Sequence, residues 1–78
     1  MADLNALFYK LKEIVGEGNI SMFGQEISLT LPNMECYVCD AGNTPNQFKV
    51  EIEGNNTPQT LNFTNVVSFV KENFAQAA

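Results

Sequence analysis

The sequence predicts a two-layer α+β sandwich, in which a helix at each end of the chain covers one face of an antiparallel meander sheet of four to five strands. Apolar residues recur at helical spacing near both ends of the chain. Between these segments, apolar and polar residues alternate as in strands with one buried face. The links between the predicted strands are too short for parallel crossovers, so consecutive strands should pair antiparallel. We expect residues 1–78 to form one small domain.

The first helix is predicted from Asp3 to Val15. Its apolar stripe consists of Leu4, Leu7, Phe8, Leu11, Ile14 and Val15. Asp3 is placed to cap the N-terminus of this helix. Gly16 and Gly18 should end it, because glycine tolerates the left-handed conformation of a C-terminal cap.

The next two strands, residues 20–23 and 25–31, flank Gly24. A two-residue loop that begins at Gly24 is a type II′ turn, with glycine at the position that requires positive φ. We prefer this register because it buries more apolar surface than a loop one residue earlier. It aligns two apolar pairs, Met22 with Ile27 and Ile20 with Leu29.

The third strand is predicted over residues 35–40, after a turn at Pro32 and Asn33. A two-residue loop would turn Cys36 and Val38 inward and leave Tyr37 and Cys39 outward, whereas a three-residue loop would reverse this. We expect the two-residue loop because it places Cys36 and Val38 opposite inward residues of the preceding strand.

The last part of the chain predicts two more strands and a helix. After a loop over 41–46, residues 48–53 alternate clearly, and a turn cluster over 54–58 precedes a short strand over 60–63. Leu61 and Phe63 should point inward from that strand. The closing helix is predicted over about residues 65–75, with Thr64 as its N-cap.

Composition argues against several classes of function. The chain has nine acidic residues, four lysines and no histidine, for a formal net charge of −5. Without arginine or a basic footprint we expect no direct nucleic-acid binding. Without histidine or a plausible nucleophile–base pair we expect no enzyme activity, no metal and no cofactor. No apolar run is long enough to cross a membrane and no signal peptide is visible, so we expect a cytoplasmic protein of the producing or host cell.

Cys36 and Cys39 form the only spacing that matches a named chemical motif, Cys-x-x-Cys. A redox pair of this kind normally opens a helix, whereas these two residues lie in a strand pattern. Residues three apart on a strand point to opposite faces, which disfavours a disulfide between them. A zinc site needs four ligands, which only two chains together could supply. We therefore expect one core cysteine and one surface cysteine.

The sheet face not covered by helices is the candidate binding surface. Its predicted residues are Ser28, Thr30, Lys49, Glu51, Thr60 and Asn62. The residues predicted to bind a partner are Tyr37, Glu26, Glu51, Glu53 and Lys49. Tyr37 would be an aromatic residue on a polar face, a type of residue that interfaces favour.

These features predict a small acidic, non-enzymatic module that binds another protein, with acidic residues steering it to a basic surface. The helix–sheet–helix plan and the acidic charge are similar in organisation to several phage-encoded inhibitors of host defence. That similarity implies an inhibitor that occupies a surface of a host protein. The alternative is a self-assembling structural subunit, a homodimer through the open sheet face or an edge strand.

Overall fold

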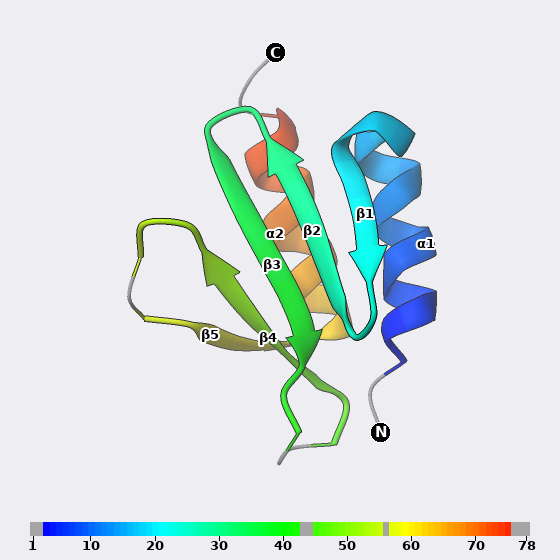
Figure 1. Cartoon of the computed structure of the whole chain (residues 1–78), viewed down its shortest axis with the longest axis vertical. Helices are drawn as coiled ribbons and strands as arrows, with labels where there is room; N and C mark the ends of the chain where they lie inside the picture. Colours follow the sequence, from blue (N-terminus) through cyan, green and yellow to red (C-terminus); the bar gives the residue numbers. More distant parts are fainter. Residues whose placement is uncertain (1–2, 43–44, 56, 76–78) are drawn as a thin grey trace.

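The computed structural model describes residues 3–42, 45–55 and 57–75, and its architecture is the predicted one. Five antiparallel strands form one sheet in the order β1-β2-β3-β4-β5, and two helices cover one of its faces (Figure 1). The elements are α1 (Leu4–Val15), the 3₁₀ turn η1 (Glu17–Asn19), β1 (Ile20–Phe23), β2 (Glu26–Leu31), β3 (Met34–Asp40), β4 (Gln47–Ile52), β5 (Gln59–Asn62) and α2 (Phe63–Ala75).

Helix α1 begins and ends where the sequence predicts. The Asp3 carboxylate accepts a hydrogen bond from the Ala6 N–H at 3.0 Å, so Asp3 is the N-cap. Gly16 has a φ of 86°, and its N–H donates to the Lys12 carbonyl at 2.9 Å. Gly18, which we also expected at the helix end, lies instead in η1. This tight turn carries the chain directly from α1 into β1.

The hairpin of β1 and β2 has the predicted register. Met22 pairs with Ile27 and Ile20 pairs with Leu29. Gly24 has a φ of 57°, and Gln25 is not among the residues with positive φ. Positive φ at only the first central position is the mark of a type II′ turn. This turn therefore determines which residues of β1 face the helices.

The inward face of β3 follows from the loop that precedes it. Leu31 pairs with Met34, so Pro32 and Asn33 form the predicted two-residue loop. Cys36 is then opposite Leu29, and both side chains are buried against the helices. Tyr37 lies on the other face of the sheet.

The start of α2 differs from the prediction. The helix begins at Phe63, and the Asn62 side chain accepts a hydrogen bond from the Asn65 N–H at 2.8 Å. Asn62 is therefore the N-cap, and the assignment of Thr64 was wrong. Either residue type can cap a helix, but Asn62 ends β5 and so stands where the backbone changes conformation. Phe63 still packs on the core, with its ring 6.3 Å from that of Phe48.

The loops after β3 and after β4 each contain a local hydrogen bond from a backbone N–H to a side chain. The carboxylate of Asp40 accepts from the Gly42 N–H at 2.8 Å, and the Asn55 side chain accepts from the Thr57 N–H at 3.0 Å. These are Asx turns, which let the chain reverse at the ends of β3 and β4. Part of each loop, residues 43–44 and residue 56, lies outside the described residues.

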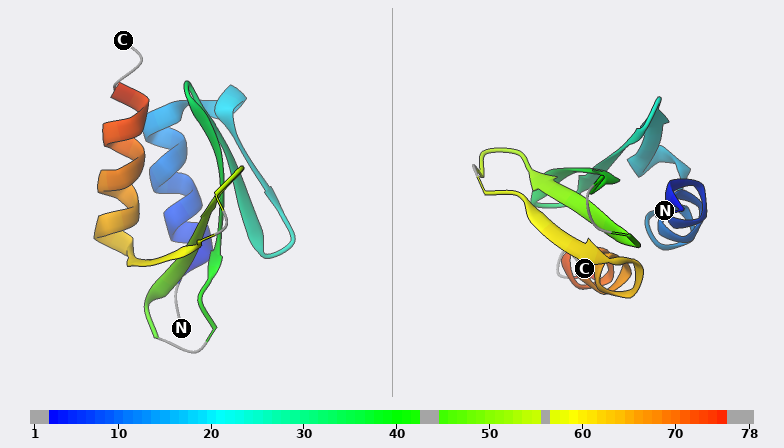
Figure 2. Two further views of the ribbon diagram at one scale, coloured as in Figure 1. Left: turned by 90° about the vertical axis from the view of Figure 1, so that its left-hand side faces the viewer. Right: turned by 90° about the horizontal axis from the view of Figure 1, so that it is seen from below.

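The core lies between the sheet and the helices. Both helices stand on the same side of the sheet and contact each other (Figure 2). The buried side chains are Leu4, Leu7, Leu11, Val15, Ile20, Ile27, Leu29, Leu31, Cys36, Val38, Phe48, Val50, Val66, Val67 and Val70. All are apolar or cysteine, and no polar side chain of the described residues is buried among them. No helix or strand of the described residues covers the opposite face of the sheet (Figure 2). Among the described residues, no helix has the length and apolarity that crossing a bilayer requires.

Candidate binding face

The uncovered face of the sheet, which we call the open face, carries rows of side chains that run across the strands. The strand register determines these rows, because residues paired across antiparallel strands point to the same side. The first row is Phe23, Glu26, Cys39, Lys49 and Thr60. The second row is Ser21, Ser28, Tyr37 and Glu51. The third row is Thr30, Glu35 and Glu53.

The structure brings all five predicted binding residues to this face. Tyr37 lies on the central strand β3, with Ser28 on one side and Glu51 on the other. Glu26 and Lys49 belong to the neighbouring row, and Glu53 follows the end of β4. Tyr37 is half-buried although no helix covers it, because cross-strand neighbours shield the sides of its ring. The open face is therefore a polar surface with one aromatic residue, Tyr37, at its centre.

The charge of the chain is concentrated on the open face. Four of the nine acidic residues lie here, Glu26, Glu35, Glu51 and Glu53, against a single lysine. The face therefore has a formal charge of −3 out of the chain's −5. Lys49 is already engaged, since its Nζ lies 3.6 Å from the Glu51 carboxylate. The remaining three lysines lie on the helices.

The carboxylates of the open face change the ionisation of their neighbours. Glu53 and Glu35 share a hydrogen bond between their side chains, which together with their mutual repulsion raises the pKa of Glu53 above its ordinary value of 4.5. The negative charge of Glu53, followed by smaller effects of burial and of other carboxylates, raises the pKa of Tyr37. Tyr37 therefore remains a neutral hydrogen-bond donor well into the alkaline range.

Sequence reasoning missed three residues of the open face, Ser21, Phe23 and Glu35. Phe23 is 82% exposed and ends β1 at the edge of the sheet. Glu35 is exposed and lies opposite Glu53. The signal for these residues was present in the predicted registers, since a strand that turns Met22 or Cys36 inward must turn the residues on either side of it outward. Asn62, which we expected on this face, pairs with Gln47 two residues beyond the pair of Lys49 and Thr60, and it also caps α2.

The two cysteines lie on opposite faces of β3 and are both free. Cys36 is fully buried in the core, and burial raises the pKa of its thiol to about 11. Cys39 lies on the open face and is partly exposed; burial is also the main cause that raises the pKa of its thiol. In residues 3–42, 45–55 and 57–75, no group of three or more histidine, cysteine, aspartate or glutamate side chains is placed to hold a metal ion.

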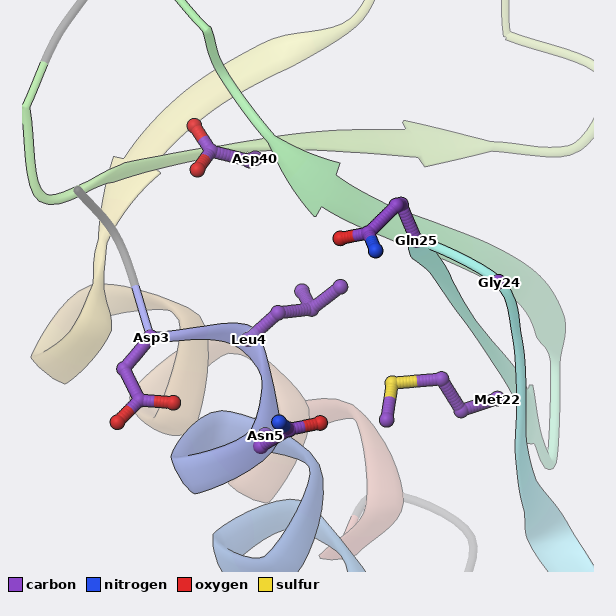
Figure 3. A pocket seen from close by; sticks show the side chains of 7 residues that line it. All are labelled: Asp3, Leu4, Asn5, Met22, Gly24, Gln25 and Asp40. Carbon is purple, nitrogen blue, oxygen red and sulfur yellow. The ribbon is translucent and has the colours of Figure 1, made fainter.

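A pocket of about 460 Å³ opens at the end of the sandwich, between the start of α1 and the β1–β2 turn (Figure 3). Leu4 and Met22 face each other across it, and the Gln25 amide reaches over the gap. Its two carboxylates, on Asp3 and Asp40, each accept a backbone hydrogen bond that shapes a helix start or a turn. We therefore interpret this pocket as the open end of the core layer.

The fold and the open face define a small α+β sandwich with an uncovered acidic sheet. No protein-family model, no curated protein and no solved structure matches this chain. Any functional conclusion must therefore come from the chemistry of the face itself.

Proposed function

We propose that this protein is a non-enzymatic binding module that docks its open face on a basic surface of another protein. The observation that supports this proposal is the composition of the open face. It carries four carboxylates, one lysine that pairs with Glu51, and Tyr37 at its centre. Such a surface repels acidic partners and attracts basic ones.

Two kinds of residue would contribute differently to binding. The carboxylates of Glu26, Glu51 and Glu53 would accelerate association, since long-range attraction acts before contact. Tyr37, and Phe23 at the edge of the face, would hold the complex together, because buried aromatic side chains often supply most of the binding energy. A basic surface covered in this way could no longer accept its own acidic ligands. The proposed consequence is inhibition by occupation.

Self-assembly through the open face is the competing interpretation, and the charge argues against it. A two-fold dimer would set the same surface of both copies together. Each copy would then bring a formal charge of −3 to one interface, which is unfavourable at neutral pH. Light scattering after size exclusion tests this directly. A dimer that persists at high salt would favour the structural subunit over the binding module.

The test of binding uses matched variants on the two faces. Wild-type protein is used to capture partners from an extract of the cells in which it acts, and the captured protein is purified for kinetics. We expect the Glu26→Gln, Glu51→Gln, Glu53→Gln triple variant to associate more slowly and with a weaker salt dependence. The control, Glu13→Gln, Glu17→Gln, Glu72→Gln, makes the same change of charge on the helices and η1.

The aromatic contribution has its own control. Tyr37→Ala should speed dissociation by about tenfold or more, as expected for a central aromatic anchor. Tyr9→Ala removes a tyrosine from the exposed side of α1, where the residue is 64% exposed, and should leave the kinetics unchanged. If the helix-side variants impair binding as much as the open-face variants, the open face is not the docking surface.

A further inference from the structure

Glu35 and Glu53 lie directly opposite each other on the open face. The Glu53 N–H donates to the Glu35 carbonyl at 2.9 Å, which continues the β3–β4 ladder one residue beyond the pair of Cys36 and Ile52. Side chains opposite each other on antiparallel strands have Cβ atoms only about 4.5–5.5 Å apart. Two ionised carboxylates in this position repel each other and destabilise the sheet.

No lysine relieves this repulsion. Lys49 lies four positions before Glu53 along the strand direction, and its Nζ is held by Glu51. Lys12 pairs with Glu17 at 3.2 Å, and Lys10 and Lys71 lie on the helices, on the far side of the sheet. In the part of the chain that the structure describes, no lysine therefore lies at this position, and a proton is the simplest substitute.

The other groups that face the pair belong to the sheet alone. Tyr37 is two residues along β3, and Glu51 is two residues before Glu53. Glu26 on β2 is further along the face, and the cross-strand neighbour of Glu35 on β2 is the neutral Thr30. Both helices lie on the other side of the sheet and bring no charge to the pair (Figure 2). Among the described residues, none of these neighbours brings a positive charge that would hold Glu53 ionised.

We infer that Glu35 and Glu53 form a proton-binding pair that makes docking of the open face on a basic partner dependent on pH. This inference rests on the proposed function of that face. In the free protein at a pH below the raised pKa of Glu53, the Glu53 carboxyl group holds a proton beside Glu35. In the complex a lysine or arginine side chain of the partner takes the place of that proton, which is released to solvent.

The direction of the pH effect follows from this exchange. Above the raised pKa of Glu53 its carboxylate is ionised, and the open face has its full charge. When the pH falls through that value the pair takes up a proton, the face loses one negative charge, and association with a basic partner weakens. Stability changes in the opposite direction. Since the folded state binds the proton more tightly than the unfolded state, stability is gained as the pH falls through the raised pKa towards 4.5.

The first experiment needs no partner. The carboxyl carbons of the glutamates are titrated by NMR in the wild-type protein and in Glu35→Gln. We expect Glu53 to titrate above 4.5 in the wild type and to return to its ordinary range in the variant. Glu26→Gln, on the same face but opposite Cys39, should leave Glu53 unchanged. An ordinary titration of Glu53 in the wild type, or no response to Glu35→Gln, would overturn the inference.

The second experiment measures proton release on binding. A short oligo-arginine peptide is titrated into the protein at low ionic strength, in two buffers with different heats of ionisation. Wild-type protein should release protons near the raised pKa and bind the peptide more weakly as the pH falls. Glu35→Gln should release fewer protons and show a smaller change of affinity with pH. Binding without proton release refutes the acid pair, whereas no binding of the peptide at any pH counts against the docking proposal.

Discussion

Cys36 and Cys39 show how strongly the pleat of one strand separates two identical side chains. Cys36 lies in the core and Cys39 on the open face, although three positions separate them in β3. The thiolate is the reactive form of cysteine, and burial disfavours it. With its pKa raised from 9.0 to about 11, the Cys36 thiol is essentially un-ionised at neutral pH. The Cys-x-x-Cys spacing therefore corresponds to one core cysteine and one surface cysteine on the same strand.

This separation predicts unequal thiol reactivity. In the folded protein at mildly alkaline pH, Cys39 should react with an aromatic disulfide reagent at least about tenfold faster than Cys36. The Cys39→Ser variant should react only slowly until denaturant is added, and then at the rate of an unfolded thiol. Absorbance of the released thiol measures both rates. Equal reaction of the two cysteines in the native state would show that Cys36 is accessible.

At the scale of the elements, the junction of β5 and α2 joins two secondary structures with no loop between them. Asn62 is the last residue of β5 and the cap of α2. Phe63 and Val67, one turn apart in the helix, then both reach the core. Because α2 contains several valine and phenylalanine residues, which are only moderate helix formers, its start depends on this cap and on packing.

The cap can be tested by paired substitutions. Asn62→Ala should lower the free energy of unfolding by about 1 kcal/mol, the usual value for loss of an N-cap. Thr64→Ala, two residues later at an exposed position of the first turn, should change it by less than about 0.5 kcal/mol. Urea unfolding followed by circular dichroism measures both. A larger loss for Thr64→Ala than for Asn62→Ala would contradict the assigned cap.

At the scale of the whole molecule, the sheet has one apolar face, which the helices bury, and one acidic face, which is open. The two helices shield the apolar face of the sheet, and their contact with each other closes that layer. Four glutamates, Glu26, Glu35, Glu51 and Glu53, lie on the opposite side, where water solvates them. A chain of 78 residues has only this one layer of core, so both helices are needed to complete it.

The packing of both helices on one face of the sheet can be tested by placing a charged residue on the buried side of each helix. Leu11→Asp and Val70→Asp each place a carboxylate at a position that is at most 1% exposed, and each should unfold the protein. Lys10→Asp and Lys71→Asp introduce the same residue at the adjacent exposed positions and should keep the fold. Circular dichroism and thermal melting compare the four variants. A cooperative melt near that of the wild type for either buried variant would contradict the two-layer arrangement.

Most of the fold could be predicted because the apolar pattern and the turn residues agree. Gly24 at the first hairpin and the alternation of residues 27–31 lead to one register, and the pairing of Met22 with Ile27 confirmed it. The β2–β3 turn was harder, since Pro32 and Asn33 allow two loop lengths with opposite faces outward. Burial of Cys36 opposite Leu29 resolved that choice. The cap of α2 was wrongly predicted, because two residue types that cap helices stand two positions apart.

The sequence by itself determined the order of the elements, the inward residues of the β1–β2 hairpin and the net negative charge, since all three depend on local pattern and composition. The tertiary structure alone decided that Glu35 stands opposite Glu53, that Phe23 stays exposed at the sheet edge, and that three-fifths of the net charge lies on one face. These facts depend on strand register across the whole sheet and on which face the helices cover. Segments far apart in the sequence set both.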